Sequence, residues 1–237
     1  MNWRIFRKAQ TVSTNIDARA GRPGDVFTAL WQSAGRGRLD HKWLSAPGKN
    51  LMMSAVLDAS GLPPEHAATL PLAVGLAVAD AAGPSAMVKW PNDVLAGGLK
   101  LAGILCERHE DCVIAGIGVN VNETRFPPAI AARATSLALL YGREFSLDEV
   151  LYAVLDALAV RFVQWRKGGL APLMDELSSR DFLKGRVISV VQTDDDGSPV
   201  SGRCSGIAPD GTLTVAGRSI WAGEAHVMDA GDAPGVF

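Results

Sequence analysis

The chain has few cysteines, little net charge and no long apolar run. Its 237 residues include 3 cysteines, and 23 lysines and arginines nearly balance 25 aspartates and glutamates, for a formal net charge of −2. Cys106, Cys112 and Cys204 form no C-x-x-C pair, and an odd number of thiols in apolar surroundings favours reduced cysteines and a cytoplasmic location. The small net charge offers no electrostatic footprint for duplex nucleic acid.

Signals for a membrane or for secretion are also missing from the sequence. The most apolar helical stretch, residues 71–79, is too short to cross a bilayer. Residues 1–8 place charges within a strand-like pattern and lack the apolar core of a signal peptide. We therefore expect a protein with neither a membrane nor a nucleic-acid partner.

The apolar pattern predicts an α+β fold in two parts, residues 1–182 and residues 183–237. In the first part, we expect a mixed, mostly antiparallel sheet backed by helices. The expected strands cover residues 3–6, 25–32, 50–57, 86–90, 99–107 and 112–120, and the expected helices cover residues 13–20, 64–82, 146–168 and 171–179. In the second part, short strands alternate with Gly, Asp and Pro turns, which favours a small β-barrel. These strands are expected at residues 187–192, 202–208, 212–215 and 219–221.

A lysine interrupts the otherwise apolar strand expected at residues 99–107. Strict alternation places Lys100 on the side of Ala102 and Ile104, opposite Leu101 and Gly103. An ammonium buried alone in a sheet would cost several kcal/mol, so Lys100 needs water or an anionic partner.

Polar motifs elsewhere allow both a functional and a purely structural interpretation. The loop of residues 35–38, Gly-Arg-Gly-Arg, suits phosphate or carboxylate, but it is equally compatible with a flexible basic turn. Asn92 and Asp93 follow Pro91, which should end strand pairing, and they form either an Asx turn or a ligand contact. Residues 13–15, Ser-Thr-Asn, are all good helix N-caps and also suit a small polar ring.

Several of these motifs together resemble one enzyme family. Gln32 with residues 35–38, then residues 89–93, 100–105 and 116–120, occur in the order seen in biotin protein ligases. The resemblance covers almost the whole chain and implies the class II synthetase-like biotin/lipoate ligase fold, followed by an SH3-like C-terminal barrel. Because the motifs begin near residue 11, the chain is similar to single-function ligases without an N-terminal DNA-binding module.

The resemblance implies a role for each residue at a matching position. Lys100 would bind the biotin carboxylate and the α-phosphate, Arg38 would stabilise the adenylate, and Asp93 would orient the acceptor lysine. These three residues are the expected catalytic groups. The residues expected to bind biotin are Ser13, Thr14, Asn15, Gln32, Gly35, Arg36, Arg38, Lys100, Gly103 and Gly116. Those expected to bind nucleotide are Arg38, Trp43, Asn92, Lys100 and Asn120.

The activity implied by the resemblance is ATP-dependent formation of biotinyl-5'-AMP, followed by transfer of biotin to a lysine. The substrates are biotin and ATP with Mg²⁺, whose protein ligands the sequence does not identify. The expected acceptor is the biotin carboxyl carrier domain of acetyl-CoA carboxylase or of a related carboxylase. A homodimer is compatible with exposed sheet edges.

Two alternatives remain open at this point. The first is a lipoate-type ligase of the same superfamily, although the motifs and the barrel resemble the biotin branch more closely. The second is a non-catalytic protein that only binds biotin or its adenylate. Asp40 and His41 stand where the family commonly has a Gly-Arg pair, which removes an expected phosphate contact and keeps the second alternative open.

Overall fold

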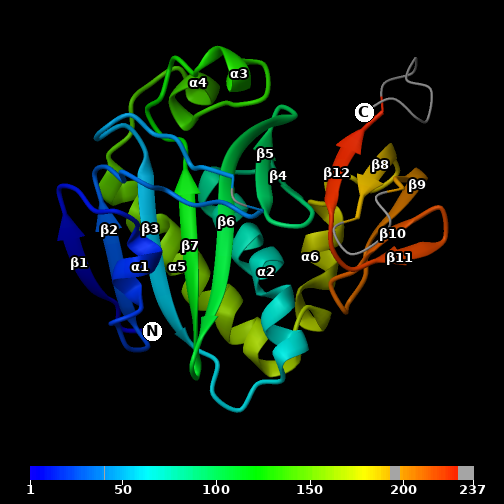
Figure 1. The fold of residues 1–237 in the computed structure, drawn as a ribbon, viewed down its shortest axis with the longest axis horizontal. Helices are drawn as coiled ribbons and strands as arrows, with labels where there is room; N and C mark the ends of the chain where they lie inside the picture. The colour runs from blue at the N-terminus through cyan, green and yellow to red at the C-terminus, as the bar shows by residue number, and fades with distance from the viewer. Residues whose placement is uncertain (40, 193–197, 229–237) are drawn as a thin grey trace.

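The computed structural model describes residues 1–39, 41–192 and 198–228, and a seven-stranded sheet forms its centre (Figure 1). The strand order is β1-β2-β3-β7-β6-β5-β4. β1 runs parallel to β2 and the other neighbouring strands are antiparallel, which confirms the expected mixed, mostly antiparallel sheet. The strands are β1 (Arg4–Lys8), β2 (Asp25–Ala29), β3 (Leu51–Asp58), β4 (Ala86–Lys89), β5 (Asp93–Ala96), β6 (Leu99–His109) and β7 (Cys112–Val119).

Two long helices, α2 (Pro64–Ala82) and α5 (Leu147–Gly168), cover one face of this sheet (Figure 1). α2 has the bounds expected from the sequence, and its predicted inner residues Leu72, Leu76 and Ala79 are buried. α5 begins after Ser146, whose Oγ accepts a hydrogen bond from the Glu149 amide, as the capping-box pattern predicts. The shorter helices are α1 (Thr14–Ala18), α3 (Pro128–Ala131), α4 (Leu137–Tyr141), the 3₁₀ turn η1 (Ala171–Leu173) and α6 (Met174–Ser179).

The strand β5 was not expected from the sequence. β4 ends at Lys89, which confirms that pairing stops at Pro91, but the turn that holds Pro91 reverses the chain, and pairing resumes at Asp93. The Trp90–Pro91 peptide bond in this turn is cis, which is compatible with a tight reversal. The helices α3 and α4, with five residues or fewer each, were also missed.

The C-terminal part is a second, antiparallel sheet of five strands in the order β11-β10-β9-β8-β12. It confirms the expected SH3-like fold. Its strands are β8 (Val187–Val191), β9 (Val200–Ile207), β10 (Leu213–Val215), β11 (Arg218–Ile220) and β12 (Glu224–Val227). β12, the strand that faces the seven-stranded sheet in Figure 1, was missed because three of its four residues are charged, polar or small.

The segment that connects the two sheets makes hydrogen bonds to both of them. Val88 on β4 exchanges backbone hydrogen bonds with Arg180 and Phe182, at 2.8 and 2.9 Å, so the connection lies along β4. The buried Asp181 carboxylate accepts hydrogen bonds from the Leu183 amide and from the Ile207 amide in the barrel.

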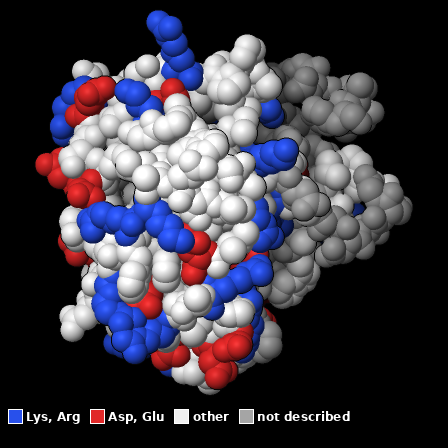
Figure 2. Space-filling model, turned by 60° about the vertical axis from the view of Figure 1, so that its left-hand side comes forward, with Lys and Arg blue, Asp and Glu red and all other residues white. Residues whose placement is uncertain are grey.

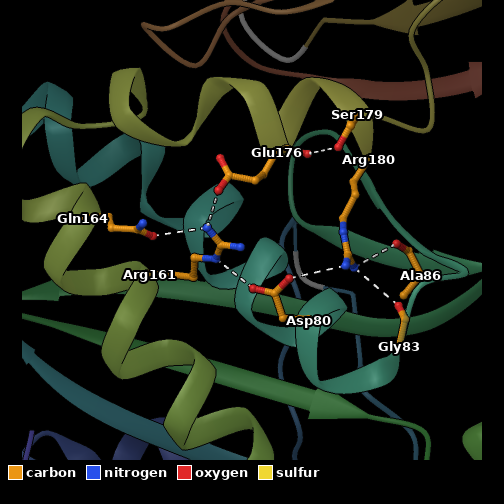
Figure 3. A network of polar contacts seen from close by, with 8 residues as sticks. All are labelled: Asp80, Gly83, Ala86, Arg161, Gln164, Glu176, Ser179 and Arg180. Atoms are coloured by element: carbon orange, nitrogen blue, oxygen red, sulfur yellow. Dashed lines mark hydrogen bonds and ion pairs between the residues drawn. The ribbon is translucent and has the colours of Figure 1, made fainter.

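Side chains fix the same junction to the helices (Figure 3). Arg161 on α5 donates to Asp80 on α2 at 2.7 Å and pairs with Glu176 on α6 at 3.2 Å. Arg180 also reaches Asp80, at 3.4 Å, and two backbone carbonyls beyond the end of α2. The barrel is therefore held against the seven-stranded sheet rather than tethered by a free linker.

Among the described residues, no helix is both long and apolar enough to cross a bilayer. Figure 2 shows blue and red side chains interspersed on the face that it draws, without one continuous basic area.

Candidate active site

A cavity of about 980 Å³ lies on the face of the sheet opposite α2 and α5. Its walls come from α1, the loop of residues 36–44, strands β6 and β7, the β4–β5 turn, and β12 of the barrel. Of the residues expected to bind or react, these line it: Ser13, Thr14, Asn15, Gln32, Arg36, Arg38, Trp43, Asn92, Asp93, Lys100, Gly103, Gly116 and Asn120. The exception is Gly35. It lies behind Trp43, whose amide donates to the Gly35 carbonyl at 3.0 Å.

Alternation along β6 and β7 makes the floor of the cavity. Ala115, Ile117 and Val119 point into the core with α2 and α5, so Gly116 and Gly118 point to the opposite face. A Cβ on Gly118 would lie 2.5 Å from Cε2 of Trp43. The glycines therefore let the indole ring lie directly on the strand.

One end of the cavity carries a network of short polar side chains. The Gln32 Oε1 accepts hydrogen bonds from the Thr14 amide at 2.7 Å and from the Thr14 hydroxyl at 3.1 Å. Ser54 Oγ on β3 lies 2.8 Å from the Thr14 hydroxyl and 2.6 Å from Asn15 Oδ1. Ser13 occupies the N-cap position of α1, but its hydroxyl makes no capping hydrogen bond. These groups suit a small ring that has both donors and acceptors.

Lys100 lies on the cavity face, contrary to the strict alternation expected from the sequence. The register between β5 and β6 shifts by one residue, so that Val94 pairs with Ala102 and Leu95 pairs with Lys100. A one-residue bulge moves the preceding side chain to the other face of the sheet. The Lys100 Nζ would accordingly lie 3.4 Å from a Cβ on Gly103.

The anionic partner that Lys100 requires is Asp93. The Lys100 Nζ lies 2.7 Å from Asp93 Oδ1. Lys89, opposite Asp93 in the β4–β5 hairpin, lines the same part of the cavity, and burial lowers its pKa from the ordinary lysine value. Burial also lowers the pKa of Arg38 on the loop, with Glu224 and Asp93 opposing that effect. Three cations therefore surround a single carboxylate of the catalytic sheet.

The two asparagines expected near the nucleotide brace the backbone of the site. Asn92 donates its side-chain amide to the Ile104 carbonyl at 2.7 Å, across to β6 rather than within its own turn. Asn120 is buried and donates to the Thr135 carbonyl at 3.0 Å and towards the Lys100 carbonyl at 3.4 Å. Both residues thereby hold the strand that carries Lys100.

The barrel contributes to the cavity, which sequence reasoning missed. Glu224 and His226 on β12 line it, and His41 Nδ1 on the loop lies 3.5 Å from Glu224 Oε1. Asp40, the other residue of the departure noted above, lies outside the described residues. Lys89 and Glu107 were likewise missed; the alternation of β6 beyond Leu105 was a signal that pointed to Glu107.

The described residues contain no cluster of three or more His, Cys, Asp or Glu side chains that would hold a metal ion. Asp93 is the carboxylate nearest the cations, and its Oδ1 is engaged by Lys100. The donor set therefore does not fit a resident metal.

The cysteines do not take part in the site. All three are free, and burial raises the pKa of Cys106, of Cys112 and, to about 11, of Cys204. Because the thiolate is the reactive form, these thiols are poor nucleophiles.

The model of the biotin/lipoate A/B protein ligase family matches residues 4–122. The chain belongs to this family. It is 35% identical over 239 residues to the biotin–[acetyl-CoA-carboxylase] ligase of Mycobacterium tuberculosis, covering 94% of this chain and 86% of that protein. It is 34% identical over 193 residues to the ligase of the same name from Paracoccus denitrificans, covering 73% and 78%.

A solved structure of the same family has the same architecture. The biotin protein ligase of Aquifex aeolicus in complex with biotin and ATP superposes with a TM-score of 0.83 at 26% sequence identity. The match covers 95% of this chain and 99% of the other, so it includes the catalytic sheet and the barrel of this family member.

Proposed function

We propose that the protein activates biotin with ATP to form biotinyl-5'-AMP and transfers biotin to a lysine of a biotin carboxyl carrier domain. The observation that carries this proposal is the placement of Lys100. Its ammonium lies over the glycine floor, beside Asp93, in a cavity whose other end is a small polar network. A ligand with a polar ring at one end and a carboxylate at the other fits this arrangement.

Biotin lies with its ureido ring at the polar end and its carboxylate near Lys100. Ser13, Thr14 and Gln32 supply hydrogen bonds to the ring. Gly103 leaves room for the ligand beside Lys100, and Gly116 leaves room for Asn15, which forms the wall at the ring end. Trp43 covers the ligand, and its buried indole N–H, unpaired among the described residues, is a donor for a polar group of the adenylate.

Activation brings two anions together. The biotin carboxylate attacks the α-phosphate of ATP, the bond to the β-phosphate breaks, and pyrophosphate leaves. Lys100 and Arg38 reduce the repulsion between the reacting groups and stabilise the charge on the transferring phosphate. Mg²⁺ enters with ATP as part of the substrate, since the donor set offers no preformed metal site.

Transfer uses the same corner of the cavity. The acceptor lysine attacks the mixed anhydride as a neutral amine, which forms an amide and releases AMP. Asp93 accepts a hydrogen bond from that amine and orients it. Arg36, Arg38 and Trp43, on the loop over the cavity, keep water from the adenylate.

The identity of the acceptor protein, the cellular location and the oligomeric state belong to the proposal as well. We expect the carrier domain of acetyl-CoA carboxylase or of a related carboxylase as acceptor, and a cytoplasmic location, where ATP and reduced thiols occur together. We also predict that the protein can form a homodimer and that it does not bind DNA, as expected for a single-function ligase. Sedimentation at enzyme concentration and a DNA mobility assay test them.

Biotin-dependent exchange between ATP and pyrophosphate tests the function. We expect exchange with biotin and not with lipoate, and transfer of labelled biotin to a carrier domain. Exchange that requires lipoate would identify a lipoate-type ligase. Tight biotin binding without any exchange would identify a non-catalytic binding protein.

A further inference from the structure

Glu107 is an acidic side chain on the cavity face of β6, four residues after Gly103. Residues two apart on a strand share a face, so Gly103, Leu105 and Glu107 point to the same side. Glu107 does not itself line the cavity but lies directly behind Asn15 and Arg36, which do, and its side chain is 22% exposed. A half-sequestered carboxylate beside a site for an anionic substrate requires a structural reason.

The carboxylate connects three separate segments. Asn15 on α1 donates its side-chain amide to Glu107 Oε2 at 2.6 Å. Arg36 on the loop lies 3.1 Å from Glu107 Oε1, and Arg19, just after α1, lies 3.7 Å from the same oxygen. A charge-assisted hydrogen bond is stronger than a neutral one, so these contacts link the loop and α1 to the sheet.

The contacts of Glu107 also fix the orientation of Asn15. The amide nitrogen of Asn15 faces Glu107 and the Leu105 carbonyl, at 2.6 and 3.3 Å. Its oxygen faces Ser54, and a Cβ on Gly116 would lie 2.2 Å from it. Asn15 therefore has its donors and its acceptor engaged by protein, and it forms the wall of the polar end.

We propose that Glu107 is a positioning residue for biotin, which holds Asn15 against Gly116 and ties the Arg36 end of the loop over the cavity. This inference rests on the proposed function. Without the carboxylate, the Asn15 amide loses its strongest acceptor, and Arg36 and Arg19 lose their common counter-charge. The loop is then free to open, which weakens biotin binding and shortens the lifetime of the bound adenylate.

The test is Glu107→Gln, which keeps the shape of the side chain and removes its charge. We expect KM for biotin in the exchange reaction to rise by about tenfold, the effect of losing one charge-assisted contact. KM for ATP and kcat should stay within about twofold of the wild type, because Lys100, Arg38 and Asp93 are untouched. Biotinyl-5'-AMP formed on the variant should escape or hydrolyse faster in a filter-retention assay.

A double-mutant cycle with Arg36→Gln shows whether the two residues act as a unit. If they do, the double variant is no worse than the poorer single variant. Glu144→Gln is the control, since it removes a carboxylate that lies 3.7 Å from Lys49, and neither residue lines the cavity. It should leave both KM values unchanged.

The outcomes separate the two proposals. If the wild type performs no biotin-dependent exchange, the proposed function fails. If the wild type is active and folded Glu107→Gln has the same KM for biotin and the same adenylate retention, the positioning role is wrong. Equal rises in both KM values would indicate a general structural role and overturn it too. Should Glu107→Gln fail to fold, Glu107→Asp, which is too short to reach Arg36, carries the same expectation for biotin.

Discussion

The two faces of the hairpin formed by β6 and β7 have different roles. One face packs in the hydrophobic core, and the other forms the floor of the cavity. On one face, Ala115, Ile117 and Val119 pack with α2 and α5 in the main core. On the other face, Gly118 leaves room for Trp43 and Gly116 leaves room for Asn15. The same backbone thus carries the stability of the fold on one side and its ligand cavity on the other.

Stability and ligand binding therefore depend on different residues of β7. The odd-numbered residues 115, 117 and 119 pack in the core, and the even-numbered residues 116 and 118 face the cavity. A change on the core face should lower the free energy of unfolding and leave the Michaelis constants alone. A change on the cavity face should do the reverse. The substitutions below test this separation, from the largest expected effect to the smallest.

Lys100→Ala should produce the largest loss on the cavity face. It removes the cation beside the transferring phosphate, and such losses typically lower kcat by about 10²–10³-fold. Stability should change little, because the Lys100 side chain is 40% exposed. Exchange kinetics and thermal unfolding check both statements. Full exchange activity in this variant would remove Lys100 from the mechanism.

Leu76→Ala should show the converse effect on the core face. Leu76 on α2 is fully buried, and deleting a buried leucine side chain costs about 3 kcal/mol of unfolding free energy. Because the cavity lies across the sheet, KM for biotin at a temperature where the variant is folded should match the wild type. Denaturant unfolding and exchange kinetics measure the two quantities. A raised KM in the folded variant would break the separation of the faces.

Gly118→Ala should have an intermediate effect, confined to the ligand. Its Cβ would lie 2.5 Å from Trp43, so the indole must move off the floor. We expect KM for biotin to rise by about tenfold, roughly 1.4 kcal/mol. Gly98→Ala is not a fair control because its φ is positive; Gly75→Ala on the other face, whose nearest contact is 3.5 Å, is the better match.

Alkylation of the cysteines should have the smallest effect. The raised pKa of Cys106, which packs against the core, keeps its thiol protonated at neutral and mildly alkaline pH. We expect iodoacetamide at pH 8 to leave Cys106 and Cys204 unmodified and exchange activity unchanged, with mass spectrometry as the readout. Rapid labelling of Cys106 would show that the core face opens.

The elements with strong local signals were the ones predictable from the sequence. The helix α2 combines a proline at its first turn with a glycine after its last, and α5 opens with a capping box, so their bounds were recognised. The apolar pattern also predicted strands at the positions of β1 and β2, but it did not predict that the two pair in parallel. β12 was missed, because a strand whose main role is to face another domain carries polar residues.

The site was predictable where one residue type violated its local pattern. Lys100 stood out as a charge in an apolar strand, whereas Gly116 on β7 was expected only from the resemblance to biotin protein ligases. Glu107 and Glu224 were not recognised, since acidic residues near strand ends are ordinary on a surface. Alternation along β6 places Glu107 on the face of Gly103, but only the tertiary contacts, with Arg36 for Glu107 and with His41 for Glu224, show what these carboxylates hold.

The register shift between Val94 and Leu95 makes spacing, rather than composition, the constraint on this segment. Lys100 reaches the cavity because Leu101 is the extra residue of the pair, so both Leu101 and Ala102 can face the helices while the lysine does not. Inserting one residue between Lys100 and Leu101 would leave every motif residue in the chain and yet turn the ammonium towards the helices. The position of the catalytic ammonium therefore depends on the spacing of residues along β6. With the same residues at a different spacing, the lysine side chain would face the apolar core.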